Sequence, residues 1–210
     1  MSVKLIWITP NTEELIASMA RVSNPKNQDN KEFSGLLRYM IRHQHWSPFE
    51  MANAVFEINT TRDIARQILR HRSFSFQEFS QRYAEVTELE EVPLREARLQ
   101  DTTNRQNSIT SGNTVINDWW AKTQAELLRK TQEAYELALE NGIAKEQARA
   151  ILPEGLTPSR MYMNGTIRSW IHYTQLRTDK ATQKEHRQIA EQINNVLQKE
   201  LPTIWRALDE

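Results

Sequence analysis

The chain has 210 residues, of which 39% are hydrophobic, and its 27 Lys and Arg residues are balanced by 27 Asp and Glu residues. Zero net charge argues against a general electrostatic attraction to nucleic acid or to an anionic membrane, so any anion binding must be local. The chain contains no cysteine, which excludes disulfides, thiolate metal sites and cysteine nucleophiles.

The N-terminal half of the chain is expected to alternate strands and helices. Residues 3–9 are rich in β-branched and aromatic side chains, which is typical of a strand, and they lack the pattern of a signal peptide. Because no apolar run is long enough to span a membrane, we expect a cytoplasmic protein without membrane contact. The Asn11-x-x-Glu14 pattern predicts a capping box ahead of a helix that ends near residue 22. The other elements expected in this half are helices at 31–44 and 61–72, a strand at 54–59 and an extended segment at 80–86.

The C-terminal half is predicted to be mostly helical. Residues 87–113 are polar and rich in turn-forming residues, and a loop of this length is typical of a lid, an oligomer arm or a mobile segment. A long helix is predicted at 114–140, where Asn141-Gly142 ends it. The remaining elements expected are helices at 144–151, 166–177 and 182–201, the last capped by Thr182-x-x-Glu185, and a brief strand at 160–163. The chain therefore reads as one α/β (α+β) domain over residues 1–210, helix-rich around a central mixed β-sheet, with a polar loop or lid at about 87–113.

Residues 70–83 read RHRSFSFQEFSQRY and hold the densest group of cations in the chain. A guanidinium binds phosphate or carboxylate through two parallel hydrogen bonds, which the point charge of Lys cannot do. The five glycines of the chain form neither a P-loop nor a dinucleotide-binding pattern, so a nucleotide would be held by side chains. The segment therefore predicts an anion site, with a solvated basic helix end as the simpler alternative.

Three other groups allow more than one interpretation. Arg168, His172 and Gln175 share one stripe of the helix predicted at 166–177, which is either its wet side or a face toward a ligand cavity. Arg149 alone would be a partner of its helix dipole. His43-x-His45 has no third ligand at metal-binding spacing, so no metal is expected.

Two non-enzymatic classes also remain open. Aromatic residues near arginines resemble a base-stacking nucleic-acid surface, although the chain has no basic stripe, so no nucleic-acid partner is expected. Trp119 and Trp120 open the long helix and predict core or oligomer packing, which would also suit an interaction scaffold.

Five segments, in order along the chain, resemble the flavin-dependent thymidylate synthase family. They are the His45-Trp46-Ser47-Pro48-Phe49-Glu50 segment, Ala65-Arg66-Gln67, the RHR string followed by Ser80-x-Arg82, Arg149 before Ile-Leu-Pro, and the run from Arg168-Ser169-Trp170 to Gln183-x-Glu185. The resemblance implies a homotetramer that binds FAD and dUMP at subunit interfaces. It implies the conversion of dUMP to dTMP, with methylenetetrahydrofolate as one-carbon donor and NADPH as reductant through the flavin.

The resemblance also implies roles for individual residues. Arg177 would activate the uracil by stabilising charge at its N3 side. The residues that would hold dUMP are Gln67, Arg70, Glu78, Ser80, Gln81, Arg82 and Arg149. The residues that would contact FAD are His45, Ser47, Arg70, His71, Arg72, Glu78, Thr166, Arg168 and His172.

The residues themselves support this reading independently. A methylase without cysteine cannot attack uracil with a thiolate, so activation must come from a bound cofactor and from electrostatic polarisation of the ring. Ser80 has no evident His/Asp pair to activate it as a nucleophile, so a hydrogen-bonding role is expected for it.

Overall fold

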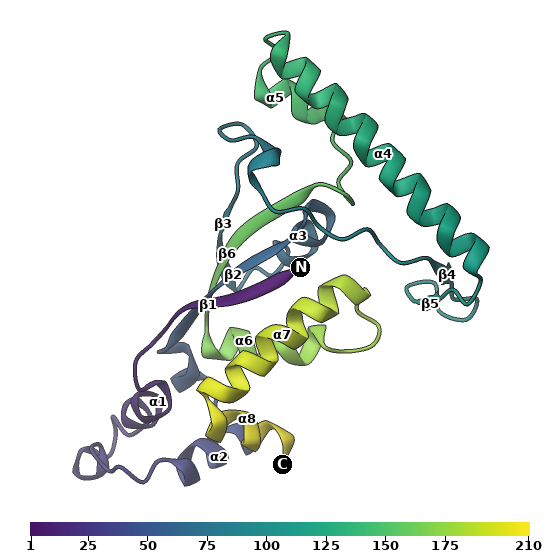
Figure 1. The fold of residues 1–210 in the computed structure, drawn as a ribbon. Coiled ribbons are helices and arrows are strands. Elements are labelled where there is room, and N and C mark those ends of the chain that lie inside the picture. The colour runs from purple at the N-terminus through teal and green to yellow at the C-terminus, as the bar shows by residue number, and fades with distance from the viewer.

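A four-stranded sheet forms the centre of the molecule in the computed structural model, which describes all of residues 1–210 (Figure 1). Its strands lie in the order β1 (Ser2–Ile8), β2 (Asn53–Thr61), β6 (Pro158–Thr166) and β3 (Phe74–Glu78), and every neighbouring pair is antiparallel. The predicted α+β class is confirmed, but the expected mixed sheet is wrong. A strand–helix–strand order commonly gives parallel neighbours. Here β6 lies between β2 and β3 and runs opposite to both.

One face of the sheet is apolar and the other is polar. Along β2, Ala54, Phe56 and Ile58 are fully buried, whereas the residues that alternate with them are only partly buried. Their partners on β6 include Met161 and Met163, which are also fully buried. Because successive side chains of a strand point to opposite faces, this alternation puts one core on one side of the sheet.

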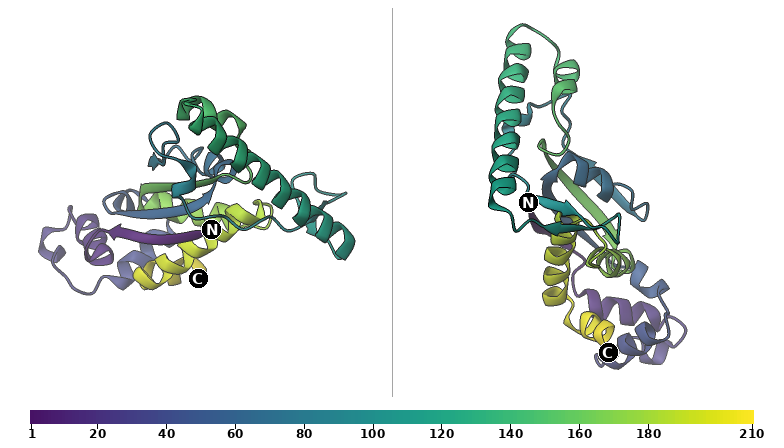
Figure 2. Two further views of the ribbon diagram at one scale, coloured as in Figure 1. Left: turned by 45° about the horizontal axis from the view of Figure 1, so that its top comes forward. Right: turned by 90° about the vertical axis from the view of Figure 1, so that its right-hand side faces the viewer.

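Helices cover the apolar face and extend from both ends of the sheet (Figures 1 and 2). Trp170 of α6 packs against Phe56 of β2, with ring centroids 4.9 Å apart, and its indole nitrogen donates to the Ala54 carbonyl. A single cluster of 27 buried residues joins these elements. The helices are α1 (Thr12–Ala20), α2 (Ser34–Arg42), α3 (Arg62–Ile68), α4 (Thr114–Glu140), α5 (Lys145–Ala148), α6 (Ile167–Arg177), α7 (Lys184–Glu200) and α8 (Pro202–Asp209). None of them is long and apolar enough to cross a membrane.

Both ends of α4 agree with the prediction. The side chain of Asn113 accepts hydrogen bonds from the backbone N–H groups of Val115 and Ile116, which caps the start of the helix. Gly142 follows its end with a φ of 79°, a left-handed conformation that glycine adopts without steric cost.

Several local predictions are wrong. Neither predicted capping box forms: Asn11 adopts a left-handed conformation and makes no side-chain cap, and the Thr182 hydroxyl bonds the Leu176 carbonyl instead. The helix predicted at 61–72 ends at Ile68, and residues 81–83 form a turn rather than an extended segment. The strand predicted at 160–163 spans all of β6, and α8 was not predicted at all.

The polar segment 87–113 contains a small hairpin and is tied to the body of the molecule. Its strands are β4 (Arg98–Gln100) and β5 (Ser108–Thr110). The Arg95 guanidinium donates to Thr61 and Asp63, at 2.8 Å each, and its backbone pairs through two hydrogen bonds with the Gln124 amide on α4. These contacts anchor the segment at Arg95, and its role as a lid stays a prediction.

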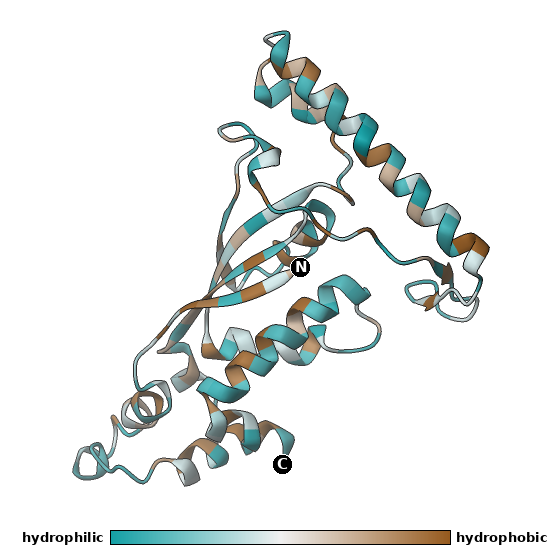
Figure 3. Ribbon diagram, viewed as in Figure 1, coloured by the Kyte–Doolittle hydropathy of each residue, from teal (hydrophilic) through white to brown (hydrophobic).

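Helix α4 lies apart from the sheet and exposes apolar side chains. Figure 3 shows brown, apolar segments along this helix. Trp119 is 61% exposed, and Val115, Leu127 and Leu137 are exposed as well. A role of these side chains in oligomer packing stays a prediction.

Candidate active site

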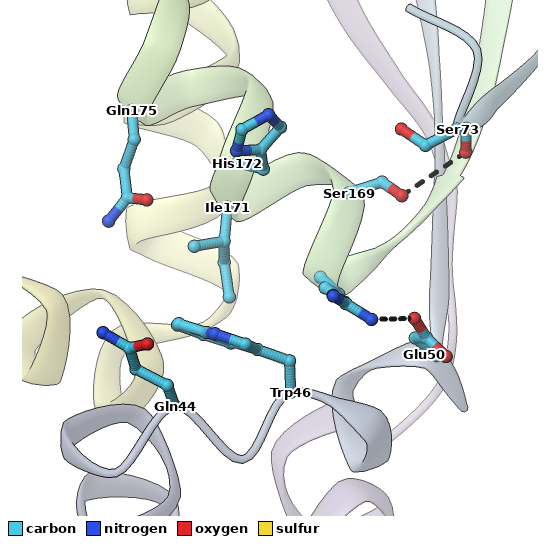
Figure 4. A pocket seen from close by; sticks show the side chains of 9 residues that line it. Gln44, Trp46, Glu50, Ser73, Ser169, Ile171, His172 and Gln175 are labelled. Atoms are coloured by element: carbon cyan, nitrogen blue, oxygen red, sulfur yellow. Dashed lines mark hydrogen bonds and ion pairs between the residues drawn. The ribbon is translucent and has the colours of Figure 1, made fainter.

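A cavity of about 560 Å³ lies between α6 and the short 3-10 turn Ser47–Glu50 that follows α2 (Figure 4). Its size falls within the range of ligand-binding clefts. In Figure 4, Gln44 and Trp46 face residues of α6 across this space. The lining residues are Gln44, Trp46, Glu50, Ser73, Arg168, Ser169, Ile171, His172 and Gln175.

The polar stripe of α6 faces this cavity. Arg168, His172 and Gln175 all line it, because residues three and four apart share one side of a helix. Thr166 does not line it. The Thr166 hydroxyl instead accepts the backbone N–H of Ser169 at 3.1 Å, which caps the start of α6.

Arg168 forms an ion pair with Glu50 at the edge of the cavity (Figure 4). The two side chains are 49% and 42% exposed, so the pair contributes little to the stability of the fold. An anionic ligand would compete with the Glu50 carboxylate for this guanidinium. The ion pair therefore keeps the Arg168 guanidinium at the cavity, where it remains partly exposed to solvent and to a ligand.

His45 and Ser47 are exposed and do not line the cavity. The His45 ring lies near Tyr39, with centroids 5.8 Å apart. Trp46, between these two predicted residues, does line the cavity, although the sequence analysis assigned it no role. Its amphipathic ring suits stacking against a planar ligand.

His71 and Arg177 form a hydrogen-bonded pair beside α6. Arg177 Nε donates to His71 Nε2 at 2.9 Å, so this nitrogen of His71 carries no proton. Burial, followed by the positive charge of Arg177, lowers the pKa of His71 to about 4. The imidazole is therefore neutral at pH 7. The terminal nitrogens of Arg177 make no hydrogen bond within the chain and remain available to a ligand.

Tyr173 and His186 lie directly beneath this pair, and the sequence analysis missed them. Both side chains are fully buried, and the Tyr173 hydroxyl lies 3.1 Å from His186 Nε2. Burial, with the charges of Arg177 and His71, lowers the pKa of His186 to about 3. The two residues come from different helices, α6 and α7, so no local sequence pattern could have joined them.

Arg70 and Arg72 are exposed and have no acidic partner or side-chain hydrogen bond within the chain. Both lie beyond the end of α3, in the turn that leads to β3. Two unpaired guanidiniums thus flank a neutral imidazole in the sequence, an arrangement whose chemistry suits an anion.

Glu78 and Gln67 are held by contacts within the chain. Ser159 donates to Glu78 Oε1 at 2.7 Å, and Arg62 lies 3.5 Å from the same oxygen. The Gln67 amide donates to Gln183 Oε1 at 2.7 Å. Both predicted ligand residues are thus oriented by partners far away in the sequence.

Arg82 and Arg149 both contact Glu146 of α5. Arg82 Nε lies 3.7 Å from the Glu146 carboxylate, and Arg149 Nε donates to the Glu146 carbonyl at 3.3 Å. Nearby Gln81 is only 4% exposed, and its amide nitrogen has no partner. A buried donor without a partner costs stability, which is typical of a functional site.

Two groups of predicted site residues lie at opposite ends of β6. The group of Ser80 to Arg82 and Arg149 lies near Pro158, whereas Arg168 and His172 follow Thr166. Since a strand rises about 3.3 Å per residue, the ends of this nine-residue strand lie about 27 Å apart. One copy of the chain therefore does not bring all the predicted residues into one cavity.

The residues at the α6 cavity fit a flavin nucleotide in their chemistry. They include a guanidinium, an imidazole, two serine hydroxyls and an indole ring, which suit a ligand that combines phosphate with a planar ring. By contrast, no group of three or more His, Asp or Glu side chains is placed to hold a metal ion.

Comparison with known proteins identifies the family. The model of the thymidylate synthase complementing protein family matches residues 4–203. The chain belongs to this family, whose curated members are flavin-dependent thymidylate synthases. It is 54% identical to a probable flavin-dependent thymidylate synthase of Paramecium bursaria Chlorella virus 1, covering 100% of this chain and 99% of the relative. It is 52% identical to the flavin-dependent thymidylate synthase of Synechocystis, covering 94% and 89%.

A solved structure of a related fold supports the same assignment. The UMP/dUMP methylase PolB from Streptomyces cacaoi, bound with 5-Br dUMP, matches with a TM-score of 0.85 and 29% identity, covering 99% of this chain and 94% of PolB. The predicted family and the class of enzyme, a flavin-dependent methyltransferase of the thymidylate synthase type, are therefore confirmed. The roles of the individual site residues stay predictions.

Proposed function

We propose that the chain catalyses the reductive methylation of dUMP to dTMP, with FAD as cofactor, methylenetetrahydrofolate as one-carbon donor and NADPH as reductant. The observation that carries this proposal is the pair of Arg177 and a neutral His71, in a chain with no cysteine thiolate to activate uracil. The match to PolB bound with 5-Br dUMP supports a pyrimidine nucleotide as substrate.

Arg177 would stabilise the negative charge that develops at the N3 side of the uracil ring. Its hydrogen bond to His71 fixes the guanidinium in place before the substrate arrives, so little reorganisation is needed. A neutral imidazole holds Arg177 without adding a second cation to the pair. FAD, when bound and reduced, would supply the reducing equivalents for the transferred one-carbon unit.

The remaining predicted residues would bind the two ligands. Arg70 and Arg72 offer unpaired guanidiniums to phosphate groups, and Arg168 and His172 line the cavity assigned to FAD. At the other end of β6, Arg82 and Arg149 both contact Glu146, and the unpaired amide of Gln81 is close by in the chain. These residues would hold dUMP.

We further propose that the enzyme is a homotetramer with its sites at subunit interfaces. Two observations support this: the predicted residues include groups at opposite ends of β6, a strand whose ends lie about 27 Å apart, and α4 exposes apolar side chains. Assembly would bring one group of each copy to the other group of its neighbour. Light scattering on the purified protein tests the stoichiometry, and a monomer that retains full activity would contradict it.

The reaction is tested by anaerobic incubation of the purified protein with dUMP, methylenetetrahydrofolate, FAD and NADPH, scored for dTMP. We expect dTMP only when all four are present. A colourless protein that gains no FAD on titration, or a flavin-loaded protein that makes no dTMP, would refute the proposal.

A further inference from the structure

Four polar side chains form a continuous line of hydrogen bonds from the 87–113 segment to α3. We call Gln67, Gln183, Glu185 and Arg98 the Gln67 network. Arg98 Nη2 lies 2.6 and 2.7 Å from the two oxygens of Glu185. Glu185 Oε2 accepts from Gln183 Nε2 at 3.0 Å, and Gln183 Oε1 accepts from Gln67 Nε2 at 2.7 Å. The network joins residues that are up to 116 positions apart in the sequence.

Glu185 fixes which group donates and which accepts in each hydrogen bond of the network, because a carboxylate can only accept. Glu185 is only 5% exposed. Burial alone would raise the pKa of Glu185, but hydrogen bonds from Arg98 and Gln183 outweigh this effect and hold the pKa below its usual value. Glu185 is therefore ionised, and an ionised carboxylate only accepts hydrogen bonds.

Glu185 thereby determines the orientation of the side-chain amides of Gln183 and Gln67. Gln183 must turn its NH₂ group toward Glu185, which leaves its carbonyl oxygen facing Gln67. Gln67 must therefore donate from its own NH₂ group to this oxygen. The carbonyl oxygen of Gln67 makes no hydrogen bond within the chain and is left over as a free acceptor. An isolated glutamine amide would have no such preference between its two ends.

We propose that Arg98, Glu185 and Gln183 are positioning residues that present Gln67 to the nucleotide as a hydrogen-bond acceptor. This inference rests on the proposed function, in which Gln67 contacts dUMP. The network would select a ligand that places an N–H or O–H donor at this point, because a ligand that offers an acceptor there would leave two oxygens facing each other. Uracil N3–H and the sugar 3′-hydroxyl of dUMP are two donors of this kind.

The test measures the affinity of the flavin-loaded protein for dUMP and for two analogues that each lack one donor, N3-methyl-dUMP and 3′-deoxy-dUMP. For the unmodified protein, we expect one analogue to bind about tenfold more weakly than dUMP, since one hydrogen bond has that magnitude. This analogue identifies the donor. In Gln183→Met, which frees Gln67 to rotate, we expect dUMP itself to bind about tenfold more weakly and the penalty for that analogue to shrink to about twofold.

Lys184→Met is the matched control. Lys184 lies between Gln183 and Glu185 in the sequence and pairs with Glu96, which comes from the same segment as Arg98. Glu96 also lies 3.8 Å from Arg98, so Lys184→Met removes a neighbouring contact of the segment but replaces no side chain of the network. Its dUMP affinity should stay within about twofold of the unmodified protein. Glu185→Gln, which keeps the size of the side chain, provides a second variant if Gln183→Met fails to fold, and dUMP should again bind more weakly.

The outcomes separate this inference from the proposed function. If the unmodified protein binds no dUMP, the proposed function fails. If it binds dUMP but the network variants bind dUMP and both analogues with the same affinities as the unmodified protein, the network does not orient Gln67 and only this inference is overturned.

Discussion

Arg177 Nε lies 2.9 Å from His71 Nε2 and donates a hydrogen bond to it. The contact links the last residue of α6 to the turn after α3, so it joins the two segments that carry most of the predicted flavin contacts. Only one of the five donor N–H groups of the guanidinium is used in this bond. The pair therefore combines fixed orientation with free binding capacity.

Arg177→Ala should abolish dTMP formation while FAD remains bound. Loss of one preorganised donor to a developing charge lowers kcat by about 100- to 1000-fold. Arg177→Lys should also be defective, since an ammonium lacks the planar fork. Turnover is measured anaerobically, with flavin absorbance as the check on cofactor binding. Near-normal turnover in Arg177→Ala would refute the role of Arg177.

The same substitution should raise the pKa of His71 from about 4. Removing the guanidinium removes one positive charge that disfavours protonation, whereas burial still keeps the pKa below the ordinary 6.5. NMR titration of the imidazole measures the change. An unaltered His71 pKa in Arg177→Ala would mean that the charge of Arg177 does not contribute to the shift.

Arg168→Ala should weaken FAD binding about tenfold or more, because a hydrogen bond to a charged group is worth about 1.5–3 kcal/mol. Flavin fluorescence gives the Kd. Arg66→Ala is the control: Arg66 forms a similarly exposed ion pair with Glu154, outside the cavity. Equal Kd values in both variants would remove Arg168 from the FAD site.

The free energy of unfolding should fall as the pH is lowered from 6.5 to 5. His71 and His186 have lowered pKa values in the folded protein, about 4 and about 3, so the unfolded chain binds protons that the folded protein does not. The stability that they contribute is complete above pH 6.5 and is lost as the pH falls toward the folded values. Each such group contributes a slope of up to about 1.4 kcal/mol per pH unit.

His186→Gln should flatten this dependence, since glutamine can still bond the Tyr173 hydroxyl but does not titrate. Denaturation at several pH values between 5 and 7 measures the slope, in a range where ordinary carboxylates remain charged. His43→Gln, at an exposed position, serves as the control. If His186→Gln and the unmodified protein share one slope, the buried imidazole does not govern acid stability.

Gly165→Ala should destabilise the fold by about 1–3 kcal/mol through overpacking. A Cβ atom at Gly165 would clash with the ring of Phe74, which packs in turn against Trp170. Phe74→Leu should recover part of the loss in the double variant. Gly35→Ala is the control, because nothing lies within 4 Å of its added Cβ and alanine favours the helix. Urea denaturation gives the values, and equal stability of the two alanine variants would contradict the packing argument.

Some local signals in the sequence predicted local features correctly, whereas both predicted capping boxes failed. Asn141-Gly142 marks the end of α4, and the spacing of Arg168, His172 and Gln175 places them on one side of α6. Such features depend on contacts between residues a few positions apart, where helix geometry sets the outcome.

Features that depend on distant contacts were not predicted. The insertion of β6 between β2 and β3 sets every strand direction, yet no local pattern records it. The bonds from Gln67 to Gln183 and from Tyr173 to His186 likewise arise only after the helices pack. The family motifs identify the candidate site residues, but only the fold shows that some of them lie at opposite ends of one strand.

Strand β6 is hydrogen-bonded along both of its edges, to β2 and to β3. The length of β6 therefore sets the distance between the groups of predicted residues at its two ends. One extra residue within β6 would turn all later side chains to the opposite face and misalign both ends of the strand at once. A residue added at 102–106, in the exposed turn of the β4–β5 hairpin, would leave the length and pairing of β6 unchanged. The β4–β5 hairpin should thus tolerate a change of length that the strand does not.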